Sequence, residues 1–258
     1  MIQGMDDGDR TKRDLHRYRE RYSSLEFERI QEAFRRKKLL GIMLGHDGDR
    51  AIEVGCGEKS IFFDWLPKEY AVVVEPIREM AEIGLQGLEF QSGMTLEFVN
   101  GFFEDFNSND GRLFDTVILS SVLHEMNDPN VVLRKAFTLL RPGGAVFIVV
   151  TNQNSIHRLI GLSMGLLADL NERTQTEIEM QQTSAYTVES IQGLAVSAGF
   201  EIEHISTGFP KLLTHKQMKA ALELSVIDLK FLNQIYDLGE FLPSNGSEIF
   251  VKAVRRSA

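Results

Sequence analysis

Two glycines flanked by acidic residues form the part of this sequence best suited to chemistry. Residues 51–57 read Ala-Ile-Glu-Val-Gly-Cys-Gly, so that a short apolar run leads directly into Gly55 and Gly57. Gly55 permits a sharp turn of the backbone, and Gly57 lets a ligand approach the main chain without a Cβ in the way. The pattern predicts a strand that ends in a ligand-binding turn, with Cys56 as a small buried residue within it.

A second acid lies where a bound nucleoside would need one. Glu75 ends the next apolar run, residues 71–74, and lies 18 residues after Gly57. A carboxylate at the end of that strand can accept hydrogen bonds from both hydroxyls of a ribose that lies across the strand ends. Glu53, two residues before Gly55, suits a ligand that carries an ammonium group. The spacing therefore predicts a site for a nucleoside cofactor.

Two cofactor classes use this geometry, a nicotinamide dinucleotide and S-adenosylmethionine (SAM). A dinucleotide site favours a third glycine in Gly-x-Gly-x-x-Gly, because the pyrophosphate rests on the N-terminus of the following helix. Ser60 occupies that position, and Glu58 at the expected start of this helix would repel a pyrophosphate. SAM carries no phosphate, so the residues favour SAM. An NAD-dependent oxidoreductase and a purely structural turn remain the alternatives at this point.

Alternating strand and helix patterns surround the turn. Apolar runs rich in valine and isoleucine indicate strands buried on both faces, and helical periodicities separate them. The expected strands are residues 51–54, 71–74, 96–99, 116–119, 145–150, 200–205 and 248–254. The expected helices are 61–66, 77–88, 130–140, 156–170, 188–197 and 214–238, preceded by one or two helices between residues 14 and 44. This order predicts an α/β fold with a Rossmann-like, seven-stranded and mostly parallel sheet, whose last two strands form an antiparallel edge.

Motifs across residues 48–151 resemble the class I SAM-dependent methyltransferases, especially the small-molecule branch with a methyltransferase-11/12 type domain. The resemblance rests on six segments in the family's order, at residues 53–57, 74–76, 101–105, 114–125, 128–129 and 139–144. Lys59 departs from the family, which often has a glycine there for close packing. The resemblance implies an S-adenosyl-L-methionine-dependent methyltransferase, EC 2.1.1.-, with SAM as its cofactor.

The resemblance also implies which residues contact SAM. The methionine end would lie against Glu53 and the backbone of Gly55, Cys56 and Gly57. The ribose would lie on Glu75 and Pro76, the adenine against Phe103 and Glu104, and the methyl-transfer cleft beside Leu119 and Ser120. Tyr18 and Tyr22 could close over SAM from the N-terminal helices, or simply pack there.

Two histidines are the candidates for handling the methyl acceptor. The sulfonium of SAM already activates the methyl group, so the protein must align a nucleophile and exclude water, and a base is required only for a hydroxyl or a protonated amine. His124 follows the expected fourth strand and could take that proton, or could be a structural histidine. In the polar run 152–158, His157, Asn154 or Arg158 could contact the acceptor, or the run could begin a helix. His124 and Glu125 are not followed by the second histidine of a zinc protease motif, and we expect no metal.

Four segments follow from the resemblance and the patterns together. We expect an N-terminal helical cap at 1–47, a SAM-binding Rossmann-like core at 48–151, a helical substrate-lid insertion at 152–186 and the C-terminal part of the core sheet at 187–258. The expected reaction moves a methyl group to an oxygen or nitrogen of a small polar metabolite, such as a sugar or a natural-product intermediate. A SAM-dependent enzyme that does not methylate and a non-catalytic SAM-binding protein remain alternatives.

Composition restricts the partners. The net charge of −9 argues against a nucleic-acid substrate, and no apolar run approaches the roughly 20 residues that span a bilayer. A single cysteine excludes an intramolecular disulfide and fits a reducing compartment, so we expect a cytoplasmic protein that binds a small molecule and no membrane. Residues 1–40 are net basic, which indicates either a patch for an anionic substrate or two solvated amphipathic helices. The oligomeric state is left open.

Overall fold

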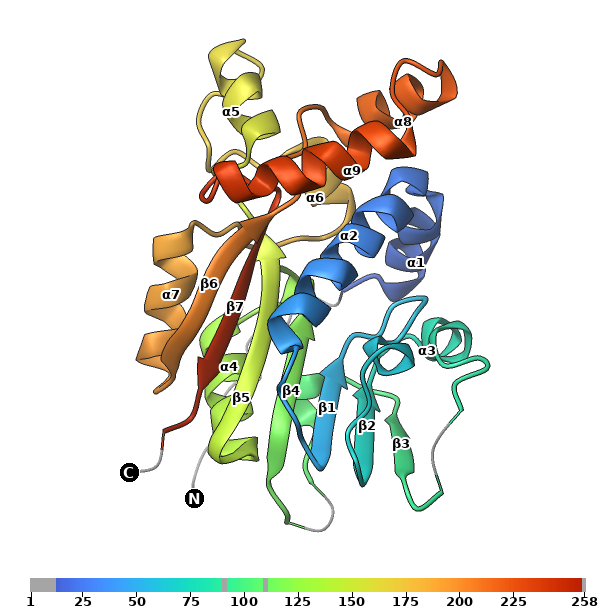
Figure 1. Cartoon of the computed structure of the whole chain (residues 1–258), viewed down its shortest axis with the longest axis vertical. Coiled ribbons are helices and arrows are strands. Elements are labelled where there is room, and N and C mark those ends of the chain that lie inside the picture. Colours follow the sequence, from blue (N-terminus) through green and yellow to red (C-terminus); the bar gives the residue numbers. More distant parts are fainter. Residues whose placement is uncertain (1–12, 90–91, 109–110, 257–258) are drawn as a thin grey trace, which may run out of the picture.

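Seven strands form the sheet of this computed structural model, which describes residues 13–89, 92–108 and 111–256 (Figure 1). They are β1 (Arg50–Val54), β2 (Tyr70–Val74), β3 (Thr95–Val99), β4 (Phe114–Ser120), β5 (Leu140–Thr151), β6 (Glu201–Gly208) and β7 (Glu248–Val254). The spatial order is β3-β2-β1-β4-β5-β7-β6, and β7 alone among these seven runs in the direction opposite to the other six. The predicted Rossmann-like, mostly parallel sheet is confirmed, as is the antiparallel pairing of the last two strands.

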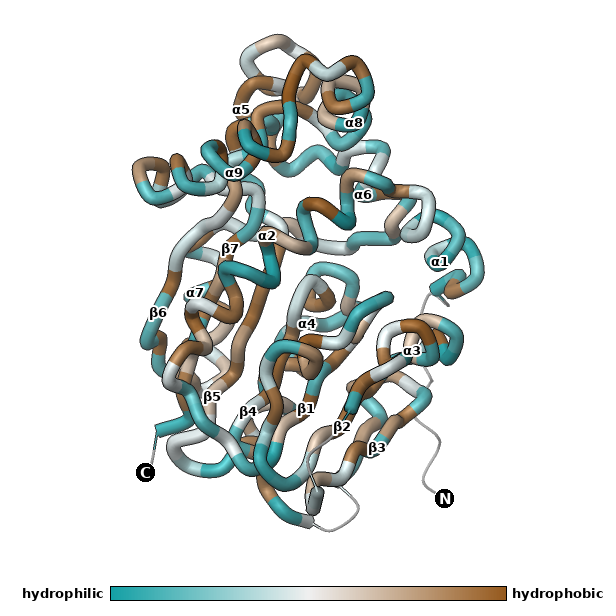
Figure 2. The backbone as a smooth tube through the Cα atoms, turned by 45° about the vertical axis from the view of Figure 1, so that its right-hand side comes forward, coloured by the Kyte–Doolittle hydropathy of each residue, from teal (hydrophilic) through white to brown (hydrophobic). Residues whose placement is uncertain are grey.

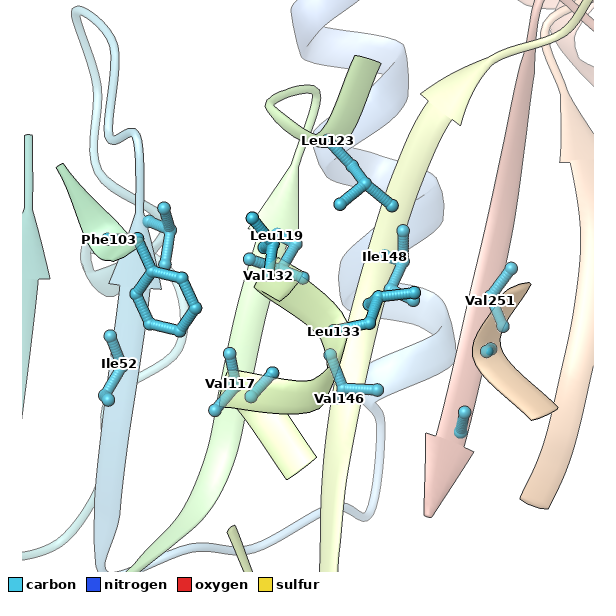
Figure 3. Close-up of a cluster of buried hydrophobic side chains, with 14 of the residues drawn as sticks. Ile52, Phe103, Val117, Leu119, Leu123, Val132, Leu133, Val146, Ile148 and Val251 are labelled. Atoms are coloured by element: carbon cyan, nitrogen blue, oxygen red, sulfur yellow. The ribbon is translucent and has the colours of Figure 1, made fainter. Parts of the chain in front are cut away.

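The strands form where the sequence carries β-branched and aromatic residues, because both faces of the sheet are covered. On one face, Ile52, Val117 and Ile148 belong to a buried cluster that packs against the helix after β4 (Figure 3). The residues between them, such as Ala51, Ile118 and Phe147, point to a second buried cluster on the other face. Alternate residues along each strand are therefore buried on opposite faces of the sheet. For this reason the strands appear in the sequence as continuous apolar runs.

The helices are α1 (Leu15–Ser24), α2 (Glu26–Met43), α3 (Arg78–Gly84), α4 (Pro129–Leu139), α5 (Ile156–Ser163), α6 (Gln175–Glu179), α7 (Val188–Ser197), α8 (His215–Glu223) and α9 (Leu229–Leu238). Single 3-10 turns lie at η1 (Ile61–Phe63), η2 (Phe103–Asp105), η3 (Leu123–Glu125) and η4 (Gly239–Phe241). Two helix starts follow directly from sequence. Asp128 accepts from the backbone N–H groups of Asn130 and Val131 ahead of α4, and Thr187 forms a capping box with Ser190 at α7.

Three helix predictions need correction. The segment 61–66 forms only the 3-10 turn η1, because Ile61 and Phe62 pack against Leu39 and Met43 of α2, which covers this face of the sheet instead. The segment 156–170 is helical only to Ser163. The segment 214–238 is two helices, α8 and α9, since the side chain of Asp228 caps a new helix start by accepting from the Phe231 N–H.

Helices α5, α6, α8 and α9 lie beyond the carboxyl ends of the parallel strands (Figure 1). They are held there partly by α2, since Phe34 stacks on Phe209 at a ring-centroid distance of 4.7 Å and both join a buried cluster with Leu232 of α9. Figure 2 shows that the strands are largely hydrophobic, α1 is largely hydrophilic and the tip near α5 and α8 is again largely hydrophobic. None of the described helices is long and apolar enough to cross a bilayer.

The opposite end of the sheet is held by Asp115. Its Oδ2 accepts from the backbone N–H groups of Asp49 and Arg50, both at 2.8 Å, and its Oδ1 is bonded to Arg141. These hydrogen bonds, together with the positive charge of Arg141, outweigh the opposing effect of burial and lower the pKa of Asp115. This residue does not line the cavity described below, so it offers a stability test that leaves the site untouched.

We expect Asp115→Asn to lower the free energy of unfolding by about 1 kcal/mol at pH 7, because the charge-assisted bonds to two N–H groups are weakened. A carboxylate with a lowered pKa stabilises the fold above its unfolded pKa of about 3.9, and this contribution is lost as the pH falls through the folded pKa. Urea unfolding should therefore show a gap between the two proteins at pH 7 that narrows below pH 4. A gap that is independent of pH would contradict this account.

Candidate active site

A cavity of about 260 Å³ opens at the carboxyl ends of the strands, between them and helices α1, α2, α5 and α6. From Pro76 after β2 to Asn152 after β5, it crosses the ends of four adjacent strands. Thirteen of the candidate residues from sequence line it, namely Tyr18, Tyr22, Glu53, Gly55, Cys56, Gly57, Glu75, Pro76, Phe103, Ser120, His124, His157 and Arg158. Glu104 and Leu119 are not among the lining residues, and Leu119 is fully buried in the sheet core.

The glycine turn after β1 has the shape that its sequence predicts. Gly55 and Gly57 both adopt positive φ angles, of 71° and 56°. A Cβ on Gly55 would lie 2.4 Å from Val122 Cγ1, so that close packing as well as conformation requires glycine there. A Cβ on Gly84 of α3 would lie 2.5 Å from the carbonyl oxygen of Gly57. Helix α3 thus packs directly on the turn and holds it in place.

Glu53 closes this turn from within. The Ser60 hydroxyl donates to its carboxylate, and the backbone N–H of Ile61 donates to Oε1 at 2.8 Å. Only 3% of the residue is exposed, and this burial raises its pKa to about 7. The observed contacts are therefore with the turn itself, and the contact of Glu53 with an ammonium group stays a prediction.

Glu75 lies beside the turn, and part of its hydrogen-bond acceptor capacity is unused by the protein. Its carboxylate accepts from the backbone N–H of Ile77 at 2.9 Å and from that of Gly57. Burial, with the nearby charge of Glu125, raises its pKa to about 7. Within the described parts of the chain, no cationic side chain lies within 4.0 Å of it. A carboxylate offers about four acceptor positions, so two remain for a ligand.

Helix α1 covers the cavity above Glu75. Glu125 of η3 is bonded to Arg13 and accepts from the Tyr18 hydroxyl at 2.9 Å. The hydroxyl of Tyr22 would lie 3.3 Å from a Cβ on Gly57, so that this tyrosine faces the glycine turn. Both tyrosines line the cavity, and their closing over SAM stays a prediction.

A polar region that the sequence did not single out forms the other part of the cavity. Arg35 of α2 is buried, with its Nη2 2.7 Å from Glu28 Oε1 and its Nε 2.6 Å from Glu248 Oε1. Gln31 of the same helix is also buried, and Lys211 and His215 face it. The signal was present as polar residues at helical spacing along α2, but the same pattern also fits a solvated face.

The two predicted histidines lie in this cavity with unused ring nitrogens. His124 in η3 is 2% exposed, and its Nδ1 has no hydrogen-bond partner. Burial, reinforced by the charges of Arg35 and Arg13, lowers its pKa to about 3. His157 of α5 is half-buried, its Nδ1 likewise lacks a partner, and burial lowers its pKa well below the usual range.

Arg158, beside His157, holds the lid segment together. Its Nη1 lies 2.9 and 2.8 Å from the two carboxylate oxygens of Glu177 in α6. Its Nη2 donates to the carbonyl oxygens of Leu170 and Glu172. The terminal nitrogens of this arginine are thereby used within residues 158–177. A contact of Arg158 with an acceptor would compete with these bonds.

Comparison with known proteins agrees with this geometry. A family model described as a methyltransferase domain matches residues 15–205, which is most of the chain. The chain belongs to the SAM-dependent methyltransferases. Among curated relatives, the ubiquinone biosynthesis O-methyltransferase of Vibrio vulnificus strain YJ016 is 32% identical over 110 residues, which are 42% of this chain and 46% of that protein. The match thus spans less than half of that relative's length.

Solved structures share the fold over nearly the whole chain. A SAM-dependent methyltransferase from Thermotoga maritima, described as a possible histamine N-methyltransferase, has a TM-score of 0.61 and 17% identity, covering 93% of this chain and 99% of that one. The N-methyltransferase NodS from Bradyrhizobium japonicum WM9, in complex with S-adenosyl-L-homocysteine, has a TM-score of 0.55 and 12% identity, with coverages of 93% and 99%. At these identities the likeness shows the fold.

The family assignment displaces the NAD-dependent alternative. One sequence argument against NAD nevertheless needs correction, because no α-helix begins after the glycine turn and Glu58 does not lie at a helix start. Glu58 instead accepts from the Ser23 hydroxyl at 2.8 Å and lies 3.6 Å from Arg29. The absence of a helix N-terminus at this place, among the described residues, removes the usual phosphate-binding device.

The residues present fit SAM. Glu75 has free acceptor positions for two ribose hydroxyls, and the left-handed Gly57 faces the Tyr22 hydroxyl without a Cβ between them. Apolar side chains that suit a purine ring flank the acid, namely Pro76, Ile77, Met80, Phe102 and Phe103. The site therefore combines a carboxylate for a ribose, bare backbone for an amino acid tail and an apolar wall for a base.

The pKa values of the two acids predict how SAM affinity depends on pH. Glu53 and Glu75 each titrate near pH 7 in the ligand-free protein, and a ligand with an ammonium group and ribose hydroxyls favours their ionised forms. We expect S-adenosylhomocysteine to bind about three- to tenfold more weakly at pH 6 than at pH 8, as calorimetric titration would measure. Glu75→Gln should remove much of this dependence. A flat profile for the wild-type protein would refute the assignment.

Proposed function

We propose that this SAM-dependent methyltransferase moves a methyl group to an oxygen or nitrogen atom of a small polar metabolite, such as a sugar or a natural-product intermediate. The observation that carries the proposal is the cavity itself, which continues from the SAM-type half into the buried polar region of α2, His124 and Lys211. A net charge of −9 argues against nucleic acid as the acceptor.

The predicted cofactor contacts assign a role to each side of the cavity. Glu75 and Pro76 would hold the ribose, Phe103 with Glu104 the adenine, and Glu53 with the backbone of residues 55–57 the methionine end. Ser120 would lead into the transfer cleft, whereas Leu119 is buried in the sheet core behind it. When bound, SAM supplies a methyl group that is already activated by the sulfonium charge. The work left to the protein is orientation and the exclusion of water.

His124 is the proposed base and His157 a proposed acceptor contact. The ring of His124 is neutral at working pH because its pKa is low, so it can accept a hydrogen bond from an acceptor hydroxyl or ammonium. A developing positive charge on that ring would be stabilised by Glu28, whose charge raises the pKa of His124. Glu28 itself stays ionised, since the charge of Arg35 and its hydrogen bond to Glu28 lower the pKa of Glu28 to about 2 despite burial.

We further propose that residues 1–47 act as a cap and 152–186 as a lid over the acceptor, with 48–151 and 187–258 as the core. Of the cap, residues 1–12 lie outside the described part. Contacts between the two covers support the idea, because the Asp14 backbone N–H donates to Gln181 Oε1 at 2.9 Å and Arg21 lies 2.7 Å from Glu179. The covers therefore meet above the cavity.

Two successive measurements test the proposal. Thermal-shift assays should show stabilisation by S-adenosylhomocysteine and none by NAD. Incubation with methyl-labelled SAM and fractionated metabolite pools, followed by mass spectrometry, should then transfer the labelled methyl to a small molecule. Binding without any methylated product would favour a non-catalytic SAM-binding protein. A product carrying another part of SAM would favour a non-methylating enzyme.

A further inference from the structure

The polar region of the cavity contains a buried cation, Lys211, that has only one hydrogen-bond partner among the described residues. Lys211 follows β6, is 4% exposed and lines the cavity. Its Nζ donates to Gln31 Oε1 at 3.2 Å, and within the described ranges no carboxylate lies within 4.0 Å of it. An ammonium group has three donors, so two remain unused. Burying a charge without a partner is unfavourable, and such an arrangement suits a ligand that supplies the missing anion.

The carboxylates around Lys211 are already bound elsewhere. Glu28 and Glu248 share the guanidinium of Arg35, and Glu177 binds Arg158 through both of its oxygens. Their charges reach Lys211 only at longer range and do not overcome the burial that lowers its pKa to about 8. The lysine still carries its charge at neutral pH. Arg35 and Arg158 are paired with carboxylates, whereas Lys211 has no hydrogen-bonded anion among the described residues.

Gln31 fixes the hydrogen-bonding pattern beside the lysine. Its Oε1 accepts from Lys211 and from His215 Nε2, the latter at 2.9 Å, while its amide donates to Glu248. The proton of neutral His215 is therefore on Nε2. Gln31 has no oxygen position left for a third donor, so the two unused N–H groups of Lys211 must find acceptors in the cavity.

His157 supplies a second donor at this place. Its Nδ1 has no hydrogen-bond partner, and the ring lines the same cavity. The cations that act on it are Lys211 and Arg158, since His215 is neutral at working pH. An anion beside Lys211 would therefore meet the lysine charge and, on the side of His157, a ring nitrogen that can donate. A single lysine charge matches one carboxylate more closely than a dianionic phosphate.

We propose that the methyl acceptor carries a carboxylate, which binds Lys211 with His157 as a second donor. This inference rests on the proposed function, because it places the acceptor in the half of the cavity next to the SAM contacts. The carboxylate would anchor the molecule at α5 and the β6–α8 connection. Its oxygen or nitrogen nucleophile would then lie toward His124.

Matched small probes test the inference without knowledge of the true acceptor. The wild-type protein is first saturated with S-adenosylhomocysteine, whose binding tests the proposed function separately. Ligand-observed NMR titrations then compare acetate with acetamide, and benzoate with benzamide, benzylamine and phenyl phosphate. We expect at least one carboxylate to bind tenfold or more tightly than its amide, and more tightly than the amine and the phosphate. If no carboxylate exceeds its amide, or if the amine or phosphate binds best, the inference is wrong even though the cofactor binds.

Substitutions at Lys211 and His157 test whether the preference for a carboxylate arises at these residues. Lys211→Met keeps the length of the side chain and removes the charge, so the preference for carboxylate over amide should fall to within twofold while S-adenosylhomocysteine affinity is unchanged. Lys219→Met is the matched control, because Lys219 lies on α8 and pairs with Glu26 outside the cavity. Should Lys211→Met fail to fold, His157→Phe provides the second variant, with a several-fold loss of carboxylate affinity expected. A preference that survives both changes would overturn the assignment to this region.

Discussion

Glu75→Ala is expected to weaken the binding of S-adenosylhomocysteine at least tenfold. The side chain is buried beside the glycine turn, and two of its acceptor positions are unused by the protein. Removing it takes away a pair of charge-assisted hydrogen bonds to the ribose, each worth about 1.5 to 3 kcal/mol at most. Calorimetric titration at pH 8, where the carboxylate is ionised, measures the change directly.

The matched control is Glu82→Ala, because Glu82 lies exposed on α3 and does not line the cavity. The affinity of Glu82→Ala for S-adenosylhomocysteine should equal that of the wild type. Equal affinity for Glu75→Ala would reject the ribose assignment.

A conservative change at the same position separates binding from folding. The folded pKa of Glu75, about 7, lies above the unfolded value of about 4.3, so its ionisation costs stability progressively as the pH rises through this window. Glu75→Gln should therefore raise the unfolding free energy of the ligand-free protein by about 1 to 3 kcal/mol at pH 8 and by much less at pH 5. The same variant should bind the cofactor more weakly. A stability gain with lost affinity is the signature of a residue retained for its ligand.

The parts of the fold that sequence predicts are those decided by local patterns. Valine and isoleucine runs gave the strands, and Gly55 with Gly57 gave the turn, because conformation and close packing at those positions depend on neighbouring residues. The helix expected after the turn did not form. Its apolar residues Ile61 and Phe62 are covered by α2, which precedes β1 in the chain, and a local periodicity carries no information on such a partner.

In the candidate site, too, the residues set by local sequence were predicted and those brought together by tertiary packing were not. Glu53 and Glu75 were predicted from their spacing to the glycines, and both line the cavity. Lys211 and Gln31 were not, since they come from segments 180 residues apart and meet only through the packing of α2 against the β6–α8 connection. A polar residue on an amphipathic helix faces either solvent or a cavity, and only the tertiary structure distinguishes the two. Arg35 is an example, because this charged residue of α2 is buried between Glu28 and Glu248 and does not face solvent.

His124→Gln is expected to lower the rate of methyl transfer by about a hundredfold in single-turnover assays once an acceptor with a hydroxyl or ammonium group is in hand. Glutamine can hydrogen-bond to the acceptor but cannot take up its proton. The affinity for S-adenosylhomocysteine should stay within twofold, because His124 is not among the predicted cofactor contacts. Equal rates for the variant and the wild type would leave His124 as a structural residue.

Chemical rescue decides between a base and a merely structural ring. His124 is buried and lines the cavity, so His124→Ala leaves a space of its own size in which free imidazole can bind. A base role predicts that added imidazole restores part of the rate, and that substituted imidazoles of higher pKa restore more. The low pKa of His124, about 3, further predicts that protonation of this ring contributes no loss of rate between pH 8 and 5. Because Glu28 raises that pKa and Arg35 lowers it, Arg35→Met should shift any His124 titration upward, whereas a structural histidine would leave the rate profile unchanged.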